Sequence, residues 1–326
     1  MSTLQKSKPK LSIVIPLLNE HESISELYQC IVREMSAMNC VYEIIFIDDG
    51  STDGSFDIIS KLREKDECVR GLRLRRNFGK SLALNEGFRR ASGDILITMD
   101  ADLQDDPKEI PRLIDKLNEG YDLVSGWKKI RKDSIISKNI PSKLFNMMVR
   151  WGSGLKLHDF NCGFKAYRRA VAEKLHLYGE MHRFVPALVH AQGYRVTEIP
   201  VKHHPRKFGV SKFGLTRFTH GFFDFMTVVF LMKFLKRPMH FFGGLGSLVS
   251  ALGIVICAYL TYLWFAGEMI GHRPLLILGV LLIIVGMQMV TTGLVAEMLN
   301  YNNRKHDSGE IVEEWLGLQK SNPNVG

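Results

Sequence analysis

Apolar residues in the first part of the chain fall into short runs of the kind that predicts buried β-strands. The runs are rich in Ile, Val and Leu at both alternating positions, as in strands that are covered on both faces. Amphipathic stretches between them predict helices, and this alternation predicts an α/β layer with a mainly parallel sheet. The predicted strands are 11–17, 42–48, 71–74, 94–100 and 121–126, and the predicted helices are 22–38, 55–65, 80–91 and 107–118.

Two later segments have the composition of membrane-spanning helices. Residues 239–267 and 274–296 contain no Asp, Glu, Lys or Arg, and each is longer than the roughly 20 residues that cross a bilayer as a helix. The alternative is a pair of helices buried in a soluble core. Lysine and arginine residues flank the outer ends of the pair, so the positive-inside rule predicts that both ends, and the N-terminal α/β part, lie in the cytoplasm. The flanking residues are Lys233, Lys236, Arg237, Arg304 and Lys305.

The formal net charge of +9 is compatible with nucleic acid, an anionic membrane or phosphate-bearing substrates as partners. The placement of the charges favours the last two partners and gives no support for nucleic acid. The aromatic and basic segment 211–238 predicts an interfacial helix before the first span. The segment 128–150 has the same character, and we expect it to contact lipid, the alternative being a solvated helix face.

Polar side chains lie where three of the predicted strands end. Asn19 and Glu20 follow the first strand, Asp49 follows the second, and Asp100 and Asp102 close the fourth. Because α/β sheets bind ligands at the carboxyl ends of parallel strands, we expect these side chains to form a site.

Asp100 and Asp102 are two carboxylates, separated by Ala101, that can share one divalent ion. Oxygen ligands of this kind suit Mg²⁺ or Mn²⁺, and Gln104 offers a further oxygen. Such an ion would neutralise a diphosphate leaving group. A D-x-D sequence alone is more often a surface turn, but this one lies inside the longer sequence DADLQDDP.

Four motifs in order resemble glycosyltransferase family 2: PLLNE, IDDGSTD, NFGK and DADLQDDP, which begin at Pro16, Ile47, Asn77 and Asp100. The resemblance covers almost the whole chain and is nearest to the polyprenyl-phosphate sugar transferases. It implies a GT-A domain followed by interfacial helices and two transmembrane helices. It also implies a metal-dependent enzyme that transfers a sugar, with inversion, from a nucleotide-sugar to polyprenyl phosphate, for modification of cell-envelope glycans such as lipopolysaccharide.

The resemblance further implies a role for individual residues. Glu20 would bind the ribose and Asp49 the base, while Asp100, Asp102 and Gln104 would hold Mg²⁺ or Mn²⁺. For Asp53 and Asp57 we prefer helix capping and first-turn charge to a ligand role. The nucleotide-sugar would be bound by Pro16, Leu18, Glu20, Asp49, Lys80, Asp100, Ala101, Asp102, Lys128, Lys165, Arg206 and Lys212.

Two further motifs of the family follow, DFNCGFK from Asp159 and RKFGVSK from Arg206. They imply that Asp159 is the catalytic base and that Arg206 and Lys212 contact the diphosphate or the lipid phosphate. The acceptor is a phosphate monoester with a second pKa of about 6, so it is mostly an anionic nucleophile at neutral pH. Asp159 would then orient the acceptor or assist the metal. The alternative for the second motif is a basic segment that only binds anionic lipid.

Lys128 stands where mannosyl-transferring relatives tend to have an arginine, and a lysine lacks bidentate phosphate geometry. This difference favours UDP-glucose as donor, and the resemblance implies undecaprenyl phosphate as acceptor. GDP-mannose or a UDP-N-acetylhexosamine is the alternative donor. More distant alternatives are a processive polysaccharide synthase and a non-catalytic membrane scaffold. The resemblance allows a homo-oligomer. The expected division is a cytoplasmic catalytic domain at 1–210, the interfacial segment 211–238, a membrane hairpin at 239–297 and a cytoplasmic tail at 298–326.

Overall fold

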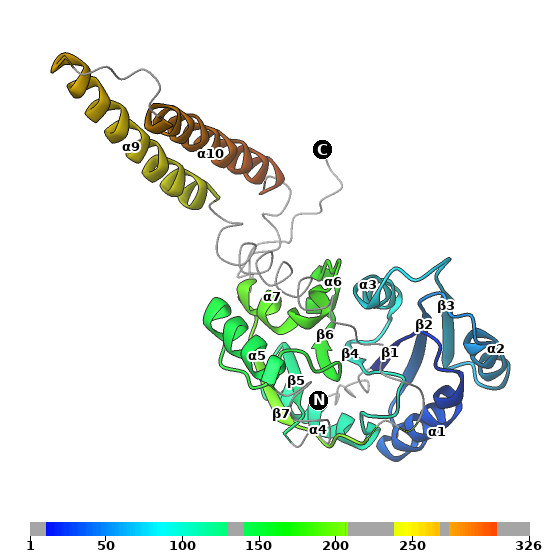
Figure 1. Ribbon diagram of the computed structural model, residues 1–326. Helices are drawn as coiled ribbons and strands as arrows, with labels where there is room; N and C mark the ends of the chain where they lie inside the picture. Colours follow the sequence, from blue (N-terminus) through cyan, green and yellow to red (C-terminus); the bar gives the residue numbers. More distant parts are fainter. Residues whose placement is uncertain (1–10, 130–139, 206, 208–237, 268–273, 305–326) are drawn as a thin grey trace, which may run out of the picture. The chain divides into compact units, whose positions relative to one another are not determined.

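The computed structural model describes residues 11–129, 140–205, 207, 238–267 and 274–304 (Figure 1). The chain divides into two compact units, Met1–Val229 and Phe230–Gly326. Arg206, Lys212, nearly all of the expected interfacial segment 211–238 and the tail after Arg304 lie outside the described residues.

The first unit contains a seven-stranded mixed sheet with the order β3-β2-β1-β4-β6-β5-β7. The pairs among β1 to β4 are parallel, while β6 runs antiparallel to both β4 and β5. The strands are β1 Leu11–Leu17, β2 Tyr42–Asp48, β3 Val69–Arg73, β4 Ile95–Thr98, β5 Leu123–Trp127, β6 Lys165–Arg168 and β7 Val196–Pro200.

Helices cover both faces of this sheet, and Figure 1 shows α3, α6 and α7 on one side with α1 and α4 on the other. Residues of α1 and α4 join the main apolar core with alternate residues of β1 and β2, whereas Gly87 of α3 lies against Val14 and Ile47 from the other face. The helices are α1 His21–Met38, α2 Ser55–Lys65, α3 Lys80–Arg90, η1 Pro107–Glu109, α4 Ile110–Asn118, α5 Ile140–Ser153, α6 Arg169–Lys174, η3 Met181–Arg183 and α7 Val185–Ala191.

The predicted strands and helices are present, and several of their ends differ. β5 begins two residues after the start of the predicted strand 121–126. β3 begins two residues before the predicted strand, and β4 is shorter than 94–100. The predicted helix 107–118 is split into η1 and α4. The short strands β6 and β7 were not predicted. The sequence of β6 is only KAYR, which has a lysine at a buried position and gains its strand pairing from β4 and β5.

The antiparallel strand β6 determines which loops meet. Because Thr98 at the end of β4 pairs with Lys165 at the start of β6, the loop that enters β6 lies beside the D-x-D segment. After β7, the chain passes beside the same segment. Asp105 and His203 form an isolated antiparallel β-bridge there, and the His204 N–H donates to the Gln104 carbonyl at 2.8 Å. Residues distant in sequence therefore gather at the carboxyl ends of β1, β2 and β4.

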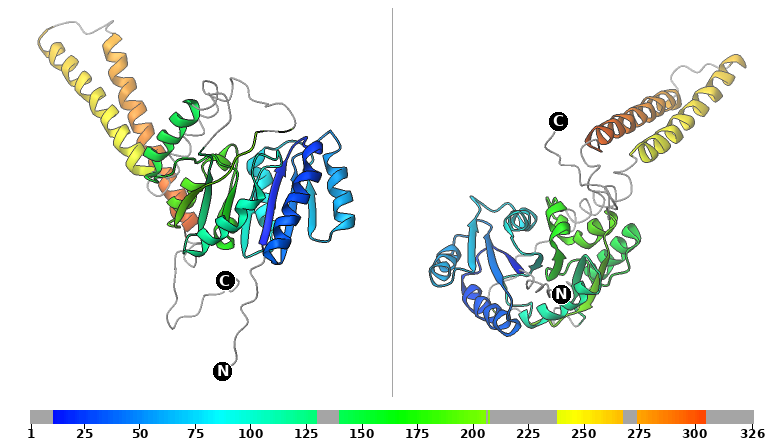
Figure 2. Two further views of the ribbon diagram at one scale, coloured as in Figure 1. Left: turned by 90° about the horizontal axis from the view of Figure 1, so that it is seen from below. Right: turned by 180° about the vertical axis from the view of Figure 1, so that it is seen from behind.

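The second unit contains the helices α9 Pro238–Phe265 and α10 Pro274–Arg304, which run side by side (Figure 2). Both are long and apolar enough to cross a membrane, and only 17% and 11% of their most apolar windows are buried. Most of these two windows is exposed in the part of the chain that the structure describes, which argues against the alternative of buried core helices. α10 extends beyond the predicted end of the hairpin at residue 297.

Glycines bring the two helices close together. A Cβ atom on Gly253 would lie 2.6 Å from the carbonyl oxygen of Gly279, and one on Gly246 would lie 2.6 Å from that of Gly286. Small residues at such positions allow the backbones of membrane helices to pack tightly. At the start of α9, the Met239 N–H donates to the Glu297 carboxylate at 3.4 Å.

Candidate active site

The loop after β2 is locked to the loop before α3. The Asp49 carboxylate accepts the N–H groups of Phe78 and Gly79 at 2.7 and 2.9 Å. Gly50 has a φ of +81°, and a Cβ atom there would lie 2.5 Å from the backbone of Arg76. The IDDGSTD and NFGK motifs thus form one interlocked wall. Asp49 is 5% exposed and holds this wall; its contact with a base stays a prediction.

The end of β1 is fixed by the same loop. The Asn19 N–H donates to Ser51 Oγ at 2.8 Å, and Asn19 Oδ1 accepts the Thr52 N–H at 2.9 Å. Asp53 accepts N–H groups from His21 and Ser55, which are the first residues of α1 and α2. Asp53 therefore stabilises two helix starts, as expected, and the neighbouring Glu20 is half-buried at the site.

The D-x-D segment leaves β4 in an unusual backbone conformation. Leu103 has a φ of +59°, a left-handed value that a leucine rarely adopts. The turn lets the Gln104 N–H donate to Asp102 Oδ1 at 3.2 Å, and Asp102 is 8% exposed. Asp100, Asp102 and Gln104 thus lie in one short turn that follows the carboxyl end of β4.

Lys80, the first residue of α3, forms an ion pair with Asp100 Oδ1. Burial by itself would raise the pKa of Asp100, but the charges of Lys80 and Lys128 outweigh it and hold this pKa well below its usual range. Asp100 is therefore a carboxylate at any physiological pH, which is the form that a metal or a cationic side chain binds.

Lys128 is held behind the D-x-D turn by Asp105, with 3.1 Å between Nζ and Oδ1. Burial alone would lower the pKa of Lys128, but the Asp105 carboxylate outweighs this effect and raises it well above its ordinary value. A buried pair of this kind is costly to break, because either partner alone would be an uncompensated charge. The contact of Lys128 with the nucleotide-sugar stays a prediction.

The loop that enters β6 packs directly on Asp100. A Cβ atom on Gly163 would lie 2.8 Å from the Asp100 carboxylate, so a larger side chain there would displace it. Thr98 Oγ1 donates to the Gly163 carbonyl at 2.7 Å. Lys165 is 2% exposed and donates to the Cys162 carbonyl. Burial lowers the pKa of Lys165 to about 8.

Asp159 lies in this loop but is 1% exposed. Its Oδ1 accepts the Asn161 N–H at 3.2 Å, and its own N–H donates to Glu198 at 3.2 Å. Glu198 also accepts the His158 N–H, and the His158 ring stacks on Trp127 with 4.1 Å between ring centroids. Asp159 therefore shapes the loop that presents Asn161, and its role as a base stays a prediction.

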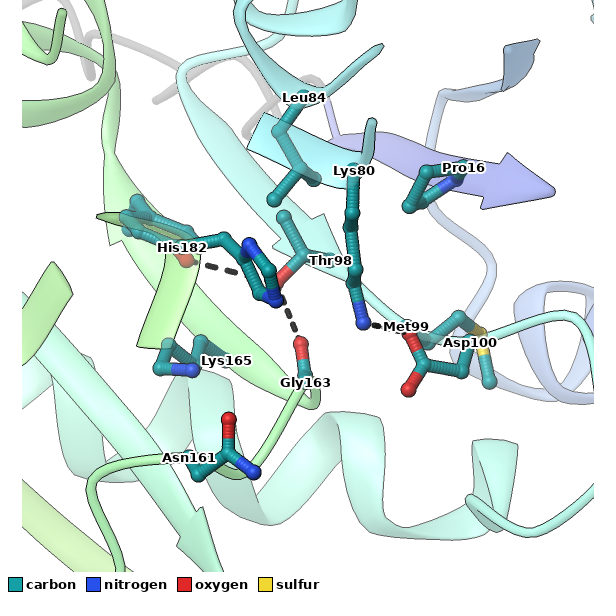
Figure 3. Close-up of a pocket in the computed structure, with 11 residues that line it drawn as sticks. Pro16, Lys80, Leu84, Thr98, Met99, Asp100, Asn161, Gly163, Lys165 and His182 are labelled. Carbon is teal, nitrogen blue, oxygen red and sulfur yellow. Dashed lines mark hydrogen bonds and ion pairs between the residues drawn. The ribbon is translucent and has the colours of Figure 1, made fainter. Parts of the chain in front are cut away.

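A pocket opens between these elements, beside Asp100 (Figure 3). Four predicted site residues line it, namely Pro16, Lys80, Asp100 and Lys165. The sequence did not single out Asn161 or His182, which also line it. Asn161 lies inside the DFNCGFK motif, whereas His182 reaches the pocket only through tertiary contacts. The remaining lining residues are Leu84, Thr98, Met99, Gly163 and Tyr167.

The residues of the D-x-D turn fit a divalent cation by the chemistry of their donors. Two carboxylates and one amide supply oxygen atoms only, which suits Mg²⁺ or Mn²⁺. Within the part of the chain that the structure describes, no cluster of three or more His, Cys, Asp or Glu residues could hold a metal.

Comparisons with known proteins identify a matching family and several relatives. Residues 12–176 match the family described as Glycosyl transferase family 2. The chain is 40% identical to dodecaprenyl-phosphate galacturonate synthase of Rhizobium johnstonii (strain DSM 114642 / LMG 32736 / 3841), over 89% of this chain and 87% of that protein. It is 33% identical to undecaprenyl-phosphate 4-deoxy-4-formamido-L-arabinose transferase of Yersinia pestis (strain Pestoides F), over 99% of this chain and 98% of that protein.

Among solved structures, the chain resembles glucosyl-3-phosphoglycerate synthase from Mycobacterium tuberculosis in complex with Mn²⁺, UDP and phosphoglyceric acid. The TM-score is 0.52 at 19% identity, and the match covers 69% of this chain and 78% of the other. At this identity the likeness shows the fold alone, which is GT-A.

Proposed function

The chain belongs to glycosyltransferase family 2, and from this membership we propose that it transfers a sugar from a nucleotide-sugar to a polyprenyl phosphate. The observation that carries the proposal is the match to a dodecaprenyl-phosphate galacturonate synthase along 89% of the chain. That match is too long to be confined to the nucleotide-binding half. The D-x-D turn and the pocket that Lys80 and Lys165 line suit a diphosphate donor. The apolar helices α9 and α10 suit a lipid acceptor.

The nucleotide half of the donor would bind at the ends of β1 and β2. Pro16, Leu18 and Glu20 lie there, next to the wall that Asp49 holds. A carboxylate such as Glu20 accepts hydrogen bonds from ribose hydroxyls. The interlocked loops give this half of the site a fixed shape before the donor arrives.

Asp100, Asp102 and Gln104 would hold Mg²⁺ or Mn²⁺ at the diphosphate, where the metal would stabilise the charge of the departing nucleoside diphosphate. Lys80 and Lys165 add positive charge on the same side of the site. Arg206 and Lys212, which lie outside the described residues, follow in sequence the residues after β7 that hydrogen-bond to the D-x-D turn. We propose that Arg206 and Lys212 contact the diphosphate or the lipid phosphate, as their positive charges suit an anionic group.

The acceptor phosphate is the nucleophile in the proposed reaction. It is mostly dianionic at neutral pH, since its second pKa is about 6, so it needs orientation more than deprotonation. Asp159 would contribute through the shape of the 159–163 loop. Attack from the face opposite the diphosphate would invert the anomeric carbon.

Two features support a position at the membrane. The hairpin supplies two helices of spanning length, and the helix α5 exposes Met147 and Trp151 on one face, at 59% and 77%. Their spacing of one helical turn, with Arg150 beside them, fits a helix that lies at a lipid surface. We propose that the catalytic unit and both termini are cytoplasmic, on the inner membrane.

For the donor we propose a UDP-sugar, with glucose as the sugar that the Lys128 substitution favours. The names of the relatives add galacturonate and 4-deoxy-4-formamido-L-arabinose as candidates. The test is competition: purified full-length protein with Mn²⁺ and undecaprenyl phosphate receives UDP-glucose, UDP-galacturonate, UDP-4-deoxy-4-formamido-L-arabinose, UDP-N-acetylglucosamine and GDP-mannose together. Mass spectrometry then identifies the lipid product. A glucosyl lipid supports the proposal, and a lipid that carries only mannose would contradict UDP-sugar specificity.

A further inference from the structure

His182 is the pocket residue that the sequence motifs do not explain. It lies in η3, and its side chain is 13% exposed. Figure 3 shows its ring projecting into the pocket, between Lys80 and Lys165.

The helix α3 holds the segment of His182 at two points about one turn apart. Ser81 Oγ accepts the His182 N–H at 3.0 Å and contacts His182 Nδ1 at 3.1 Å. Further along the helix, Asn85 exchanges two hydrogen bonds with the backbone of Leu177, at 2.5 and 3.0 Å. Because α3 also carries Lys80, which pairs with Asp100, the position of the ring is tied to the metal-binding turn.

The hydrogen bonds indicate which ring nitrogen carries the proton. Ser81 Oγ accepts the backbone N–H and can donate its single hydrogen to Nδ1. The Glu180 carboxylate, 3.9 Å from Nε2, favours the proton on Nε2. Nδ1 is then the acceptor, and Nε2 carries the N–H. Burial, followed by the charge of Lys80, keeps the pKa of His182 well below its usual range, so the ring is neutral. A neutral N–H donor beside two lysines can bind an oxygen without adding a third positive charge.

The position of the pocket limits what this donor can meet. On the proposed function, on which this inference rests, the nucleoside lies at the ends of β1 and β2 and the diphosphate lies at Asp100 and Asp102. The pocket continues from Asp100 toward β6, and neither Glu20 nor Asp49 lines it. Pro16 lines the pocket on the same side as Asp100, so the side toward His182 and Lys165 remains for the transferred sugar (Figure 3).

We propose that His182 is a specificity residue for the donor sugar, whose Nε2–H donates to an oxygen of the pyranose. Hydroxyl and carboxylate oxygens share the required chemistry, so UDP-glucose and UDP-galacturonate are both suitable probes. UDP alone lacks the sugar and therefore measures the rest of the donor site.

The experiment measures binding of UDP, UDP-glucose and UDP-galacturonate to full-length protein in detergent with Mn²⁺, by calorimetry. His182→Leu should weaken at least one UDP-sugar by about fivefold to tenfold, as expected for one lost neutral hydrogen bond, and leave UDP within about twofold. His182→Gln, which keeps an N–H donor, should recover part of the loss. His190→Leu makes the same change at an exposed histidine of α7 that does not line the pocket; it is the matched control and should change neither affinity.

Equal weakening of UDP and both UDP-sugars would overturn the inference, because it would mean general damage to the site. Unchanged affinity for all three ligands would overturn it as well. Thermal melting of each variant separates these results from loss of folding. If wild-type protein bound none of these nucleotides, the proposed function would fail first, and the inference with it.

Discussion

At the scale of residues, the site depends on carboxylates that hold two different kinds of partner. Asp49 and Asp53 accept backbone N–H groups and fix loops, whereas Asp100 faces a cation and lines a pocket. Motif position alone does not separate these roles. Burial and hydrogen-bond partners do, because a carboxylate whose oxygens both accept backbone N–H groups is already engaged.

Asp102→Asn should lower transfer about 100-fold or more, because the substitution keeps the shape of the turn and removes the charge that binds a divalent cation. Transfer of labelled sugar to undecaprenyl phosphate and Mn²⁺ binding by electron paramagnetic resonance are the two measurements. Glu119→Gln, at an exposed carboxylate, is the control. Unchanged transfer by Asp102→Asn would contradict a role of the Asp102 carboxylate in binding a divalent cation.

Lys165 should make stability depend on pH. The ordinary pKa of lysine is 10.5, and burial lowers that of Lys165 to about 8. Between these values the unfolded chain binds a proton that the folded protein has lost, so folding becomes more favourable as pH rises. Below pH 8 the full cost of the buried ammonium is present.

Lys165→Met should therefore melt at a higher temperature than wild type at pH 7, and the difference should narrow as pH rises from 8 toward 10. Thermal melting of the two proteins in detergent over this range measures the effect. Because other groups titrate in both proteins, only the difference is interpreted. A difference that stays constant with pH would contradict the assignment of a charged, buried Lys165.

Short sequence motifs predicted four of the residues that line the pocket. Pro16, Lys80, Asp100 and Lys165 were all predicted and all line the pocket. His182 could not be found in this way, because its contact with Ser81 spans 101 residues and depends on how α3 meets the segment before α7. The buried pairing of Lys128 with Asp105 was missed for the same reason.

At the scale of elements, local periodicity predicted α1 to within one residue and α2 to the residue, since both have a clear apolar face. It failed for β6, whose strand conformation comes from pairing on both sides with β4 and β5. This strand matters for function, because its antiparallel direction brings the 159–164 loop onto Asp100.

The helices α9 and α10 offer a matched pair of glycines for a test of packing. Gly253→Leu should destabilise the hairpin, because a Cβ atom there would lie 2.6 Å from the Gly279 carbonyl. Gly244→Leu makes the same change in the same helix, at a position with no atom within 4 Å of the added Cβ. We expect the first variant to melt about 5 °C or more below the second. Equal melting temperatures would contradict close packing at Gly253.

At the scale of the whole molecule, the chain combines a GT-A unit with a pair of helices long enough to cross a membrane. The sequence predicted the GT-A unit by its motifs. It predicted the two helices because each segment is free of charged residues over the length that crosses a bilayer. The proposed orientation follows from the lysines and arginines at its outer ends.

Fusions to alkaline phosphatase, which is active only outside the cytoplasm, test this orientation in bacterial cells. A fusion after Ile270, between the two spans, should be active, and a fusion after Asp307 should be inactive. The opposite pattern would place the catalytic unit on the wrong side for a cytoplasmic nucleotide-sugar.

The central part of the proposed function is transfer of the sugar to a lipid monophosphate. Purified full-length protein with Mn²⁺ and the donor selected by competition is given either undecaprenyl phosphate or undecaprenol, and the lipids are analysed by mass spectrometry. We predict that one glycosyl group is added to undecaprenyl phosphate with the phosphate retained, that one nucleoside diphosphate is released for each, and that undecaprenol does not react. Products with several added sugars, or equal reaction of undecaprenol, would contradict the account.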